Sequence, residues 1–377
     1  MKKLYYSLWK LKKLPLTEQF GQFSRSFKGK DQELIMLKKN GLVMLKKKIP
    51  AKFLYGRHNY NYTTLEGSKK KDLDTFYNFV KRNVNLKKIK KIVDIGGNDL
   101  TLSKKFKNKF NTITAIDPLV SKELNQNKGF LTIKKYIEQI NFYTVFKNTN
   151  LIIARHTLEH LSKPKYVLKK IFKNIDENCK IIIEVPDLDQ IIKKKRFDTI
   201  IHQHYYYFDQ STLTNIINES GGDVLSFKKY AEGPCGGSLI FCCKRRDIIK
   251  KTHPSKKINV ISKFKKIKKS IKYFRKDLLE LKININLAGY PIYGYGAGLM
   301  LPTFIYHLGI NTSLFKYIFD DDKNKNNFSY KNLNVKVVST DKSLPPLRSN
   351  YLITSLENKN KIKNKILKFK PNNIFTF

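Results

Sequence analysis

The stretch KKIVDIGGND, residues 90–99, decides the fold. It is an apolar run of strand length that carries the acidic residue Asp94 near its end. Two glycines, Gly96 and Gly97, and then Asn98 follow it. Glycines at the end of a first strand allow a ligand to approach the backbone, and the following helix offers free N–H groups. The stretch therefore predicts a cofactor site at the end of a buried strand.

Outward from this stretch, apolar segments of strand length alternate with helical tracts. A helix is expected over residues 68–83 and another near residues 165–174, because apolar side chains recur there at helical spacing. The strand-like segments are ITAIDP, LTIKKYI, LIIARH and KIIIEVP, with GGSLIFCCKRR as a late edge strand. Strands separated by helices indicate an α/β fold with a parallel sheet covered on both faces.

The second strand ends in ITAIDP, which places Asp117 shortly after the glycine turn. An acidic residue about 20 residues after that turn is placed to accept hydrogen bonds from a ribose diol. Dinucleotide-binding enzymes combine it with a GxGxxG turn, which this chain lacks. S-adenosylmethionine has no phosphate and needs less N–H cradling, so it is the predicted cofactor. A dinucleotide is the next choice.

The segment LIIARHTLEHL brings Arg155 and His156 to the carboxyl end of a further strand, where ligands sit in such folds. We include both among the expected cofactor-binding residues. His156 and His160 are spaced i, i+4, but a convincing metal site needs more ligands at defined spacing. The sequence therefore predicts no metal.

The formal charge is +45, and only nine of the 75 basic residues are arginines. Because bidentate recognition of phosphates and bases favours Arg, nucleic acid is not the expected partner. No apolar stretch is long enough to span a bilayer and no signal peptide is apparent, which indicates a cytoplasmic protein. The four cysteines include no CxxC pair.

Four units are expected along the chain. Residues 1–66 form a small N-terminal unit, 67–246 the cofactor-binding domain, 247–286 a Lys-rich linker helix, and 287–377 a second α/β domain. The linker has apolar residues at helical spacing, which favours a helix that packs one face between domains over a membrane-bound one.

Several segments in the same order resemble the sugar C-methyltransferases of branched deoxysugar biosynthesis. They are VDIGGND, HTLEHLSKP, IIIEVPDLDQII, RFDTIIHQHYYYF, GPCGGSL and GYGAG. The resemblance implies a Rossmann-like class I methyltransferase core, with a small N-terminal unit and a C-terminal α/β domain. It also implies a methyl transfer from S-adenosylmethionine to a carbon beside the keto group of a nucleotide-linked deoxysugar.

The chain departs from that family in three places. The cysteine pairs that hold zinc in the family's N-terminal unit are missing, so either apolar residues such as Leu34 and Leu42 hold that unit together or the unit is looser. Gln203 stands where the family has an acidic residue between two histidines. A Lys expected soon after Ala297 is also absent.

Methylation beside a ketone needs a base that removes a C–H proton and a donor that stabilises the enolate oxygen. By motif position His204 is the expected base, because neutral imidazole can accept a proton near neutral pH. His202 or Gln203 is the expected donor, and Tyr60 and Tyr62 are secondary catalytic candidates. The expected substrate-binding residues are Tyr207, Gly236, Gly237, Ser238, Gly294, Tyr295 and Gly296.

Other interpretations stay open from the residues alone. HQHYYYF can be an aromatic pocket wall with structural histidines, and GYGAG a plain strand-to-helix turn. The chain can also be a methyltransferase for another small molecule or for RNA. A further alternative is a relative that holds a nucleotide sugar without turnover.

Overall fold

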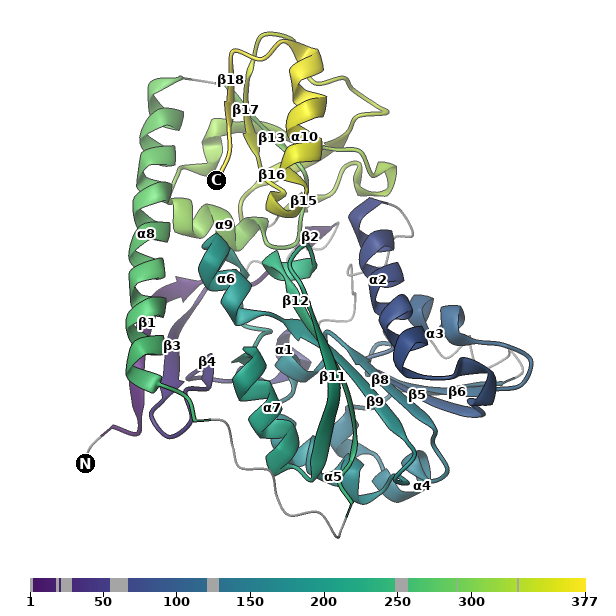
Figure 1. The fold of residues 1–377 in the computed structure, drawn as a ribbon. Coiled ribbons are helices and arrows are strands. Elements are labelled where there is room, and N and C mark those ends of the chain that lie inside the picture. Colours follow the sequence, from purple (N-terminus) through teal and green to yellow (C-terminus); the bar gives the residue numbers. More distant parts are fainter. Residues whose placement is uncertain are drawn as a thin grey trace.

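The computed structural model describes residues 3–17, 20–21, 29–54, 67–120, 129–247, 257–289, 291–330 and 332–377. The described chain builds one four-stranded sheet and two seven-stranded sheets (Figure 1). The two larger sheets lie in the central and C-terminal parts of the chain, and the smaller sheet packs beside them.

The central sheet has the strand order β11-β12-β9-β8-β5-β6-β7. Strands β5 to β9 run parallel, while β12 is antiparallel to both β9 and β11. The expectation that GGSLIFCC forms an edge strand is wrong, because β12 lies between β9 and β11. The strands are β5 (Lys91–Ile95), β6 (Thr112–Ile116), β7 (Phe130–Ile133), β8 (Leu151–Arg155), β9 (Lys180–Pro186), β11 (Gly222–Tyr230) and β12 (Ser238–Arg245).

Helices cover both faces of this sheet, because successive strand residues point to opposite sides. Ile92 packs with side chains of α2 and α3, whereas its neighbour Val93 lies in the core formed with α4, α5 and α7. The helices are α2 (Gly67–Asn83), α3 (Thr101–Phe106), α4 (Phe142–Phe146), α5 (Pro164–Lys173), α6 (Leu188–Lys194) and α7 (Gln210–Glu219). The core is therefore a doubly wound α/β domain, as the alternation in the sequence predicts.

The small sheet combines the N-terminal segment with a strand from much later in the chain. Its order is β1-β3-β4-β10, and all its neighbours are antiparallel. The strands are β1 (Tyr5–Leu14), β3 (Lys30–Leu37), β4 (Val43–Leu45) and β10 (Tyr206–Tyr207); α1 (Ala51–Leu54) follows β4. Leu34 and Leu42 are buried, as the missing cysteines require. The N-terminal sheet therefore depends on the HQHYYYF segment for its fourth strand.

The C-terminal sheet has the order β18-β17-β13-β14-β16-β15-β2. Its parallel strands are β13 (Ile292–Tyr295), β14 (Phe315–Asp320), β16 (Val335–Ser339), β17 (Asn350–Ile353) and β18 (Asn373–Phe375). The antiparallel β15 (Ser329–Tyr330) pairs with β2 (Phe20–Gly21), which belongs to the N-terminal segment. The helices of this domain are α9 (Leu301–Leu308) and α10 (Lys359–Ile366).

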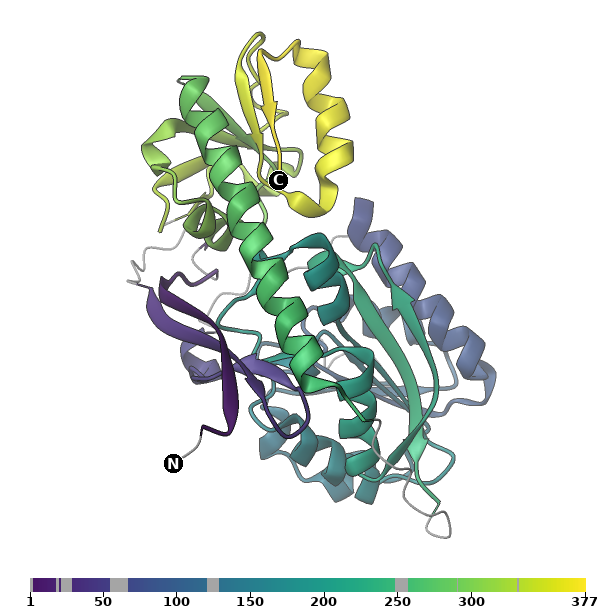
Figure 2. The same ribbon diagram turned by 60° about the vertical axis from the view of Figure 1, so that its left-hand side comes forward.

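The long helix α8 (Val260–Leu287) runs along the outside and connects the three parts (Figure 2). It begins later than the Lys-rich stretch, because the Asn259 side chain caps it by accepting a hydrogen bond from the Ser262 N–H. Its buried face includes Phe274, whose ring contacts the rings of Trp9 and His307. One apolar core thus joins β1, α8 and α9. None of the helices in the described segments is long and apolar enough to cross a membrane.

Candidate functional site

The glycine turn after β5 brings the backbone close to the neighbouring strand end. Gly96 has φ +81°, and a Cβ at this position would lie 2.2 Å from Oγ1 of Thr157. The Thr157 hydroxyl lies there because it donates a hydrogen bond to the Ile95 carbonyl at 2.9 Å. Gly97 is also close to its neighbours, since a Cβ there would lie 2.9 Å from Cβ of Ala115. The turn therefore has no room for side chains.

Asp117 lies beside this turn, as the sequence predicts. Its carboxylate accepts hydrogen bonds from the backbone N–H of Asn98 at 3.2 Å and of Leu119 at 2.7 Å. Burial raises the pKa of Asp117, while these two N–H groups act against that rise. The N–H groups fix the carboxylate at the end of β6, where each of its oxygens retains a lone pair for a diol.

Asp94 points in a different direction from the one expected for a cofactor-binding residue. It is 1% exposed and accepts a hydrogen bond from the Ser103 hydroxyl at 2.5 Å. Burial raises its pKa to about 7. Asp94 therefore fixes α3 to the end of β5, and the carboxylate presented beside the turn is that of Asp117.

A second buried carboxylate, Glu184 on β9, joins residues from three strand ends. It accepts hydrogen bonds from Nε of Arg155 at 2.6 Å and from the Ser238 hydroxyl at 2.7 Å. Nε2 of His156 lies 3.5 Å from Oε1, the oxygen that accepts from Ser238. The charges of Arg155 and His156 outweigh burial and lower the pKa of Glu184 to about 2. The sequence does mark Glu184, as an acidic residue inside the apolar run IIIEVP. It does not show which residues contact this carboxylate.

His156 is held in an unusual backbone conformation between two carboxylates. Its φ is +49°, which is uncommon for a residue with a side chain. Nδ1 lies 3.3 Å from Glu159, and the opposite nitrogen faces Glu184. Although burial acts against it, the two carboxylates raise the pKa of His156 to about 9. His156 is therefore an imidazolium at neutral pH.

Glu159, His160 and His204 form a buried cluster that sequence reasoning did not assemble. One ligand-type atom of each lies within 4.8 Å of those of the other two. The rings of His160 and His204 meet edge to face with centroids 4.8 Å apart. Nδ1 of His160 lies 2.9 Å from the Gln203 carbonyl oxygen, which indicates that this nitrogen carries the proton.

Both histidines of the cluster are neutral at neutral pH. Burial lowers the pKa of His204 to about 3, assisted by the nearby His160. Burial also lowers the pKa of His160. Burial acts against ionisation of Glu159, but its hydrogen bond to His156 and the charge of that imidazolium lower its pKa, so it stays ionised. The cluster thus contains one carboxylate and two neutral imidazoles.

Two other residues of the HQHYYYF segment, His202 and Tyr207, make contacts away from the histidine cluster. His202 faces the N-terminal unit, with Nε2 2.9 Å from the Leu14 carbonyl oxygen and Nδ1 3.4 Å from Nε2 of Gln32. The Tyr207 hydroxyl accepts a hydrogen bond from the Ile201 N–H and is fully buried. These contacts are structural rather than catalytic. Tyr60 and Tyr62 lie outside the described residues.

The two glycine segments expected to bind substrate meet at the boundary of the two larger domains. The Cys235 N–H donates to Oε1 of Glu357 at 2.7 Å. A Cβ on Gly296 would lie 2.5 Å from Cβ of Ser355, two residues before Glu357. Gly236 and Gly237 both have positive φ and pack against Arg196 and Gln190. The segments therefore lie near each other although about 60 residues separate them in the sequence.

The GYGAG turn offers little to a phosphate group. The Gly296 N–H donates to the Phe319 carbonyl at 2.7 Å, and the Ala297 N–H donates to Asp320 at 2.6 Å. The Tyr295 hydroxyl donates to Asp321 at 2.8 Å. Since these N–H groups are satisfied and two carboxylates lie beside them, the turn resembles a structural strand-to-helix connection.

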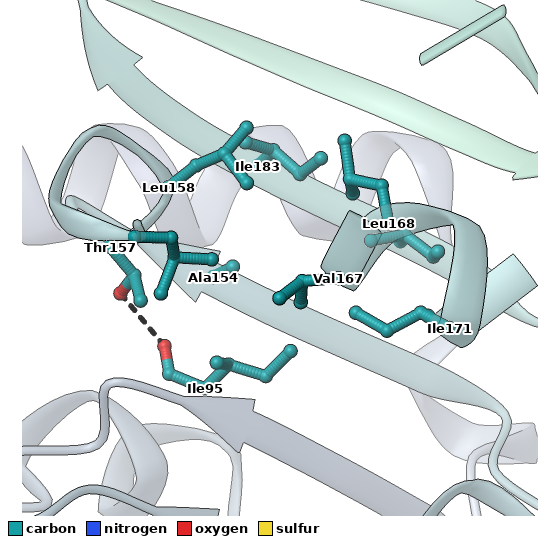
Figure 3. Close-up of a pocket in the computed structure, with 10 residues that line it drawn as sticks. Ile95, Ala154, Thr157, Leu158, Val167, Leu168, Ile171 and Ile183 are labelled. Atoms are coloured by element: carbon teal, nitrogen blue, oxygen red, sulfur yellow. Dashed lines mark hydrogen bonds between the residues drawn. The ribbon is translucent and has the colours of Figure 1, made fainter. Parts of the chain in front are cut away.

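A small cavity lies between β8, β9 and α5 (Figure 3). Its lining is mostly apolar and includes Ala154, Val167 and Ile183, with Thr157 at one side. The free volume is about 10 Å³, roughly the space of one water molecule. It is a packing defect and not a substrate site.

The comparisons with known proteins assign both larger parts of the chain. Residues 70–226 match the family described as methyltransferase domain, and residues 236–370 match the C-methyltransferase C-terminal domain. The two matches together show a methyltransferase domain followed by a C-methyltransferase C-terminal domain. S-adenosylmethionine is therefore the methyl donor of this methyltransferase, as the glycine turn and Asp117 predict.

One curated relative is C-methyltransferase NovU of Streptomyces niveus, which is 27% identical over 90 residues. This alignment covers 24% of the methyltransferase and 21% of NovU, so the chain matches about a fifth of that relative's length.

Two solved structures are similar in part. One is 1,6-didemethyltoxoflavin-N1-methyltransferase of Burkholderia thailandensis, with 11% identity, a TM-score of 0.42, and coverage of 56% of this chain and 97% of that one. The other is N-methyltransferase NodS of Bradyrhizobium japonicum, with 9% identity, a TM-score of 0.37, and coverage of 48% and 97%. Neither likeness bears on the substrate.

Proposed function

We propose that the methyltransferase adds a methyl group to the carbon beside the keto group of a nucleotide-linked deoxysugar. The observation that carries the proposal is the pair of neutral imidazoles, His160 after β8 and His204 before β10, whose ring centroids lie 4.8 Å apart. Neutral imidazole is a base suited to removing a C–H proton beside a ketone. The match to a C-methyltransferase C-terminal domain supports transfer to carbon.

The residues around the glycine turn fit S-adenosylmethionine, which supplies an electrophilic methyl group when bound. Asp117 would accept hydrogen bonds from the ribose hydroxyls, because its carboxylate is already fixed by two N–H groups. Gly96 and Gly97 would let the cofactor approach the backbone, together with Asn98. Arg155 and His156 contact Glu184 and so fix the strand ends at this edge of the sheet. The positive charge of His156 would stabilise negative charge that develops nearby during the reaction.

His204 is the proposed base, and the structure adds His160 as a second candidate. Before substrate binds, burial leaves His204 with little affinity for a proton. An enolate formed beside it would raise that affinity, since an opposite charge favours the imidazolium. The ionised Glu159 acts in the same direction. The proton would then move from the sugar carbon to a ring nitrogen, and Gln203 would hold the enolate oxygen by hydrogen bonding.

The nucleotide is proposed to lie at the boundary between the domains. The Cys235–Glu357 hydrogen bond holds the neighbouring residues Gly236, Gly237 and Ser238 at this boundary. Gly294, Tyr295 and Gly296 approach it from the C-terminal domain. Because the N–H groups of Gly296 and Ala297 are satisfied within the protein, these residues would contact sugar or base rather than the diphosphate.

A panel of nucleotide-linked 4-keto sugars, incubated with S-adenosylmethionine and read by mass spectrometry, tests the proposal. The expected product carries one additional methyl group on carbon. In deuterated water, the substrate should also exchange its α-hydrogen without cofactor. The His204→Ala variant should lose both reactions by about 10²–10⁴-fold while keeping its affinity for S-adenosylhomocysteine.

Three outcomes would contradict the proposal. Methylation only on oxygen or nitrogen would remove the need for a C–H base. Turnover of RNA but of no sugar nucleotide would favour the alternative substrate class. Binding of sugar nucleotides with S-adenosylmethionine but no product would favour a non-catalytic relative.

A further inference from the structure

The buried cluster of Glu159, His160 and His204 has the composition of a three-ligand metal site. Its members come from two segments, the single turn at Leu158–His160 and the loop just before β10. Glu159 and His204 are at most 4% exposed, whereas the His160 side chain is 25% exposed and gives the cluster contact with solvent. Two imidazole nitrogens and one carboxylate oxygen are ligands that zinc accepts in proteins.

Outer contacts fix the orientation of two of these side chains. His160 directs Nδ1 to the Gln203 carbonyl oxygen at 2.9 Å, so that its other nitrogen faces Glu159 at 3.9 Å. Glu159 is held through one oxygen by His156 at 3.3 Å. Metal-binding histidines usually donate their second ring N–H to a carbonyl or carboxylate in this way.

Two atoms of the cluster are buried without a hydrogen-bond partner in the described part of the chain. They are Nδ1 of His204 and Oε2 of Glu159. An unpaired buried polar atom destabilises the folded state, so it is seldom retained unless something binds it. Oε1 of Glu159 faces His156 and His160, so a cation held by Oε2 of Glu159 and Nδ1 of His204 would give both unpaired atoms a partner.

We propose that this cluster reversibly binds Zn²⁺ and that bound zinc inhibits the methyltransferase. Zinc with three protein ligands keeps a fourth position open, whereas Ca²⁺ and Mg²⁺ prefer oxygen ligands. An imidazole lone pair that is bound to zinc cannot accept a proton from the substrate. The inhibitory part rests on the proposed function, and the binding part does not.

Titration of the full-length, chelator-treated protein with Co²⁺ tests the binding part. Co²⁺ serves as the probe because it replaces zinc and absorbs visible light when bound by nitrogen and oxygen. One equivalent per chain should bind, and added Zn²⁺ should displace it. His160→Gln, His204→Gln and Glu159→Gln should each weaken binding by more than the ~10–100-fold that loss of an outer contact costs.

His202→Gln is the matched control, because His202 is also buried and lies two residues from His204 but faces Leu14. It should keep the Co²⁺ spectrum. Circular dichroism and S-adenosylhomocysteine affinity identify variants that do not fold. If a variant does not fold, the wild-type protein is used in its place. Zn²⁺ should then protect its histidines from modification by diethyl pyrocarbonate. Absence of a one-equivalent spectrum, or its survival in folded His160→Gln and His204→Gln variants, would overturn the proposal.

The inhibitory part is tested by adding Zn²⁺ to the methyl-transfer assay. Inhibition should weaken as the sugar nucleotide concentration rises and should be reversed by a chelator, with no change in S-adenosylhomocysteine affinity. If the protein binds Co²⁺ but methylates no sugar, the proposed function is contradicted and the zinc-binding proposal is not. An active enzyme that binds no Co²⁺, or that zinc does not inhibit, would contradict this inference alone.

Discussion

Glu184 on β9 accepts a 2.7 Å hydrogen bond from Ser238, the first residue of the neighbouring strand β12. The same carboxylate pairs with Arg155 and faces His156. It therefore links the end of β8 to the segment that follows the GPCGG turn. Because the carboxylate is fully buried, its ionised state depends on these partners.

We expect Glu184→Gln to destabilise the protein by about 3 kcal/mol, since it leaves two partly buried cationic groups, Arg155 and His156, without this carboxylate. Denaturant unfolding followed by circular dichroism measures the loss. The control is Glu219→Gln, which removes an ion pair between the partly exposed Glu219 and Lys165. It should cost no more than about 1 kcal/mol. Equal effects in the two variants would show that Glu184 is not a structural link.

His156 should make the free energy of unfolding depend on pH in the alkaline range. Its pKa is raised from the ordinary value of 6.5 to about 9, so the folded state holds a proton that the unfolded state releases. The resulting stability is present in full below pH 6.5 and is lost as the pH rises to about 9. The expected slope is at most about 1.4 kcal/mol per pH unit. Denaturant unfolding between pH 6 and 10 should show this slope in the wild type, and His156→Gln should flatten it.

Gly96→Ala should disrupt the cofactor turn. The added Cβ would lie 2.2 Å from Thr157 Oγ1, and φ +81° is itself unfavourable for alanine. We expect a lower Tm and a loss of S-adenosylhomocysteine affinity of at least tenfold, measured by thermal unfolding and calorimetry. Gly298→Ala is the matched control, because nothing lies within 4 Å of its virtual Cβ. An unchanged affinity in Gly96→Ala would place the cofactor elsewhere.

The sequence could predict the central sheet and Asp117, because both depend on patterns within a few residues. The cluster of Glu159, His160 and His204 depends on a contact across some 44 residues. It forms because β10 pairs with β4, which positions the loop before it. The direction in which Asp94 points could not be predicted either, since it is decided by Ser103 on the following helix. The sequence also could not show that β12 lies inside the sheet, because this depends on β11 pairing with the edge of β12 that does not face β9.

The N-terminal unit should fold without a metal. The described part of the unit is held by apolar packing, in which Leu34 is 1% exposed and shares one core with Phe274 of α8. In the His204→Gln variant, which lacks one ligand of the proposed zinc site, a chelator should therefore leave the Tm unchanged, whereas Leu34→Ala should lower the free energy of unfolding by about 2–5 kcal/mol. Thermal unfolding with and without chelator measures both effects. A large fall in Tm on chelation would show that a structural metal supports the fold.

Gln203→Glu restores the acidic residue of the resembling family beside the two catalytic candidates. The peptide oxygen of Gln203 already contacts His160, so a carboxylate on its side chain would lie within a few ångströms of the histidine cluster. A nearby negative charge favours the imidazolium and raises the pKa of both His160 and His204. The acidic limb of the pH–rate profile should therefore move to higher pH, with equal or greater activity at neutral pH. Asn174→Asp at the end of α5 adds the same charge on the outside of the molecule and should leave the profile in place. An unchanged pH–rate profile in Gln203→Glu would show that this side chain points away from the histidines. Lower activity at every pH would indicate that Gln203 is adapted to a different substrate.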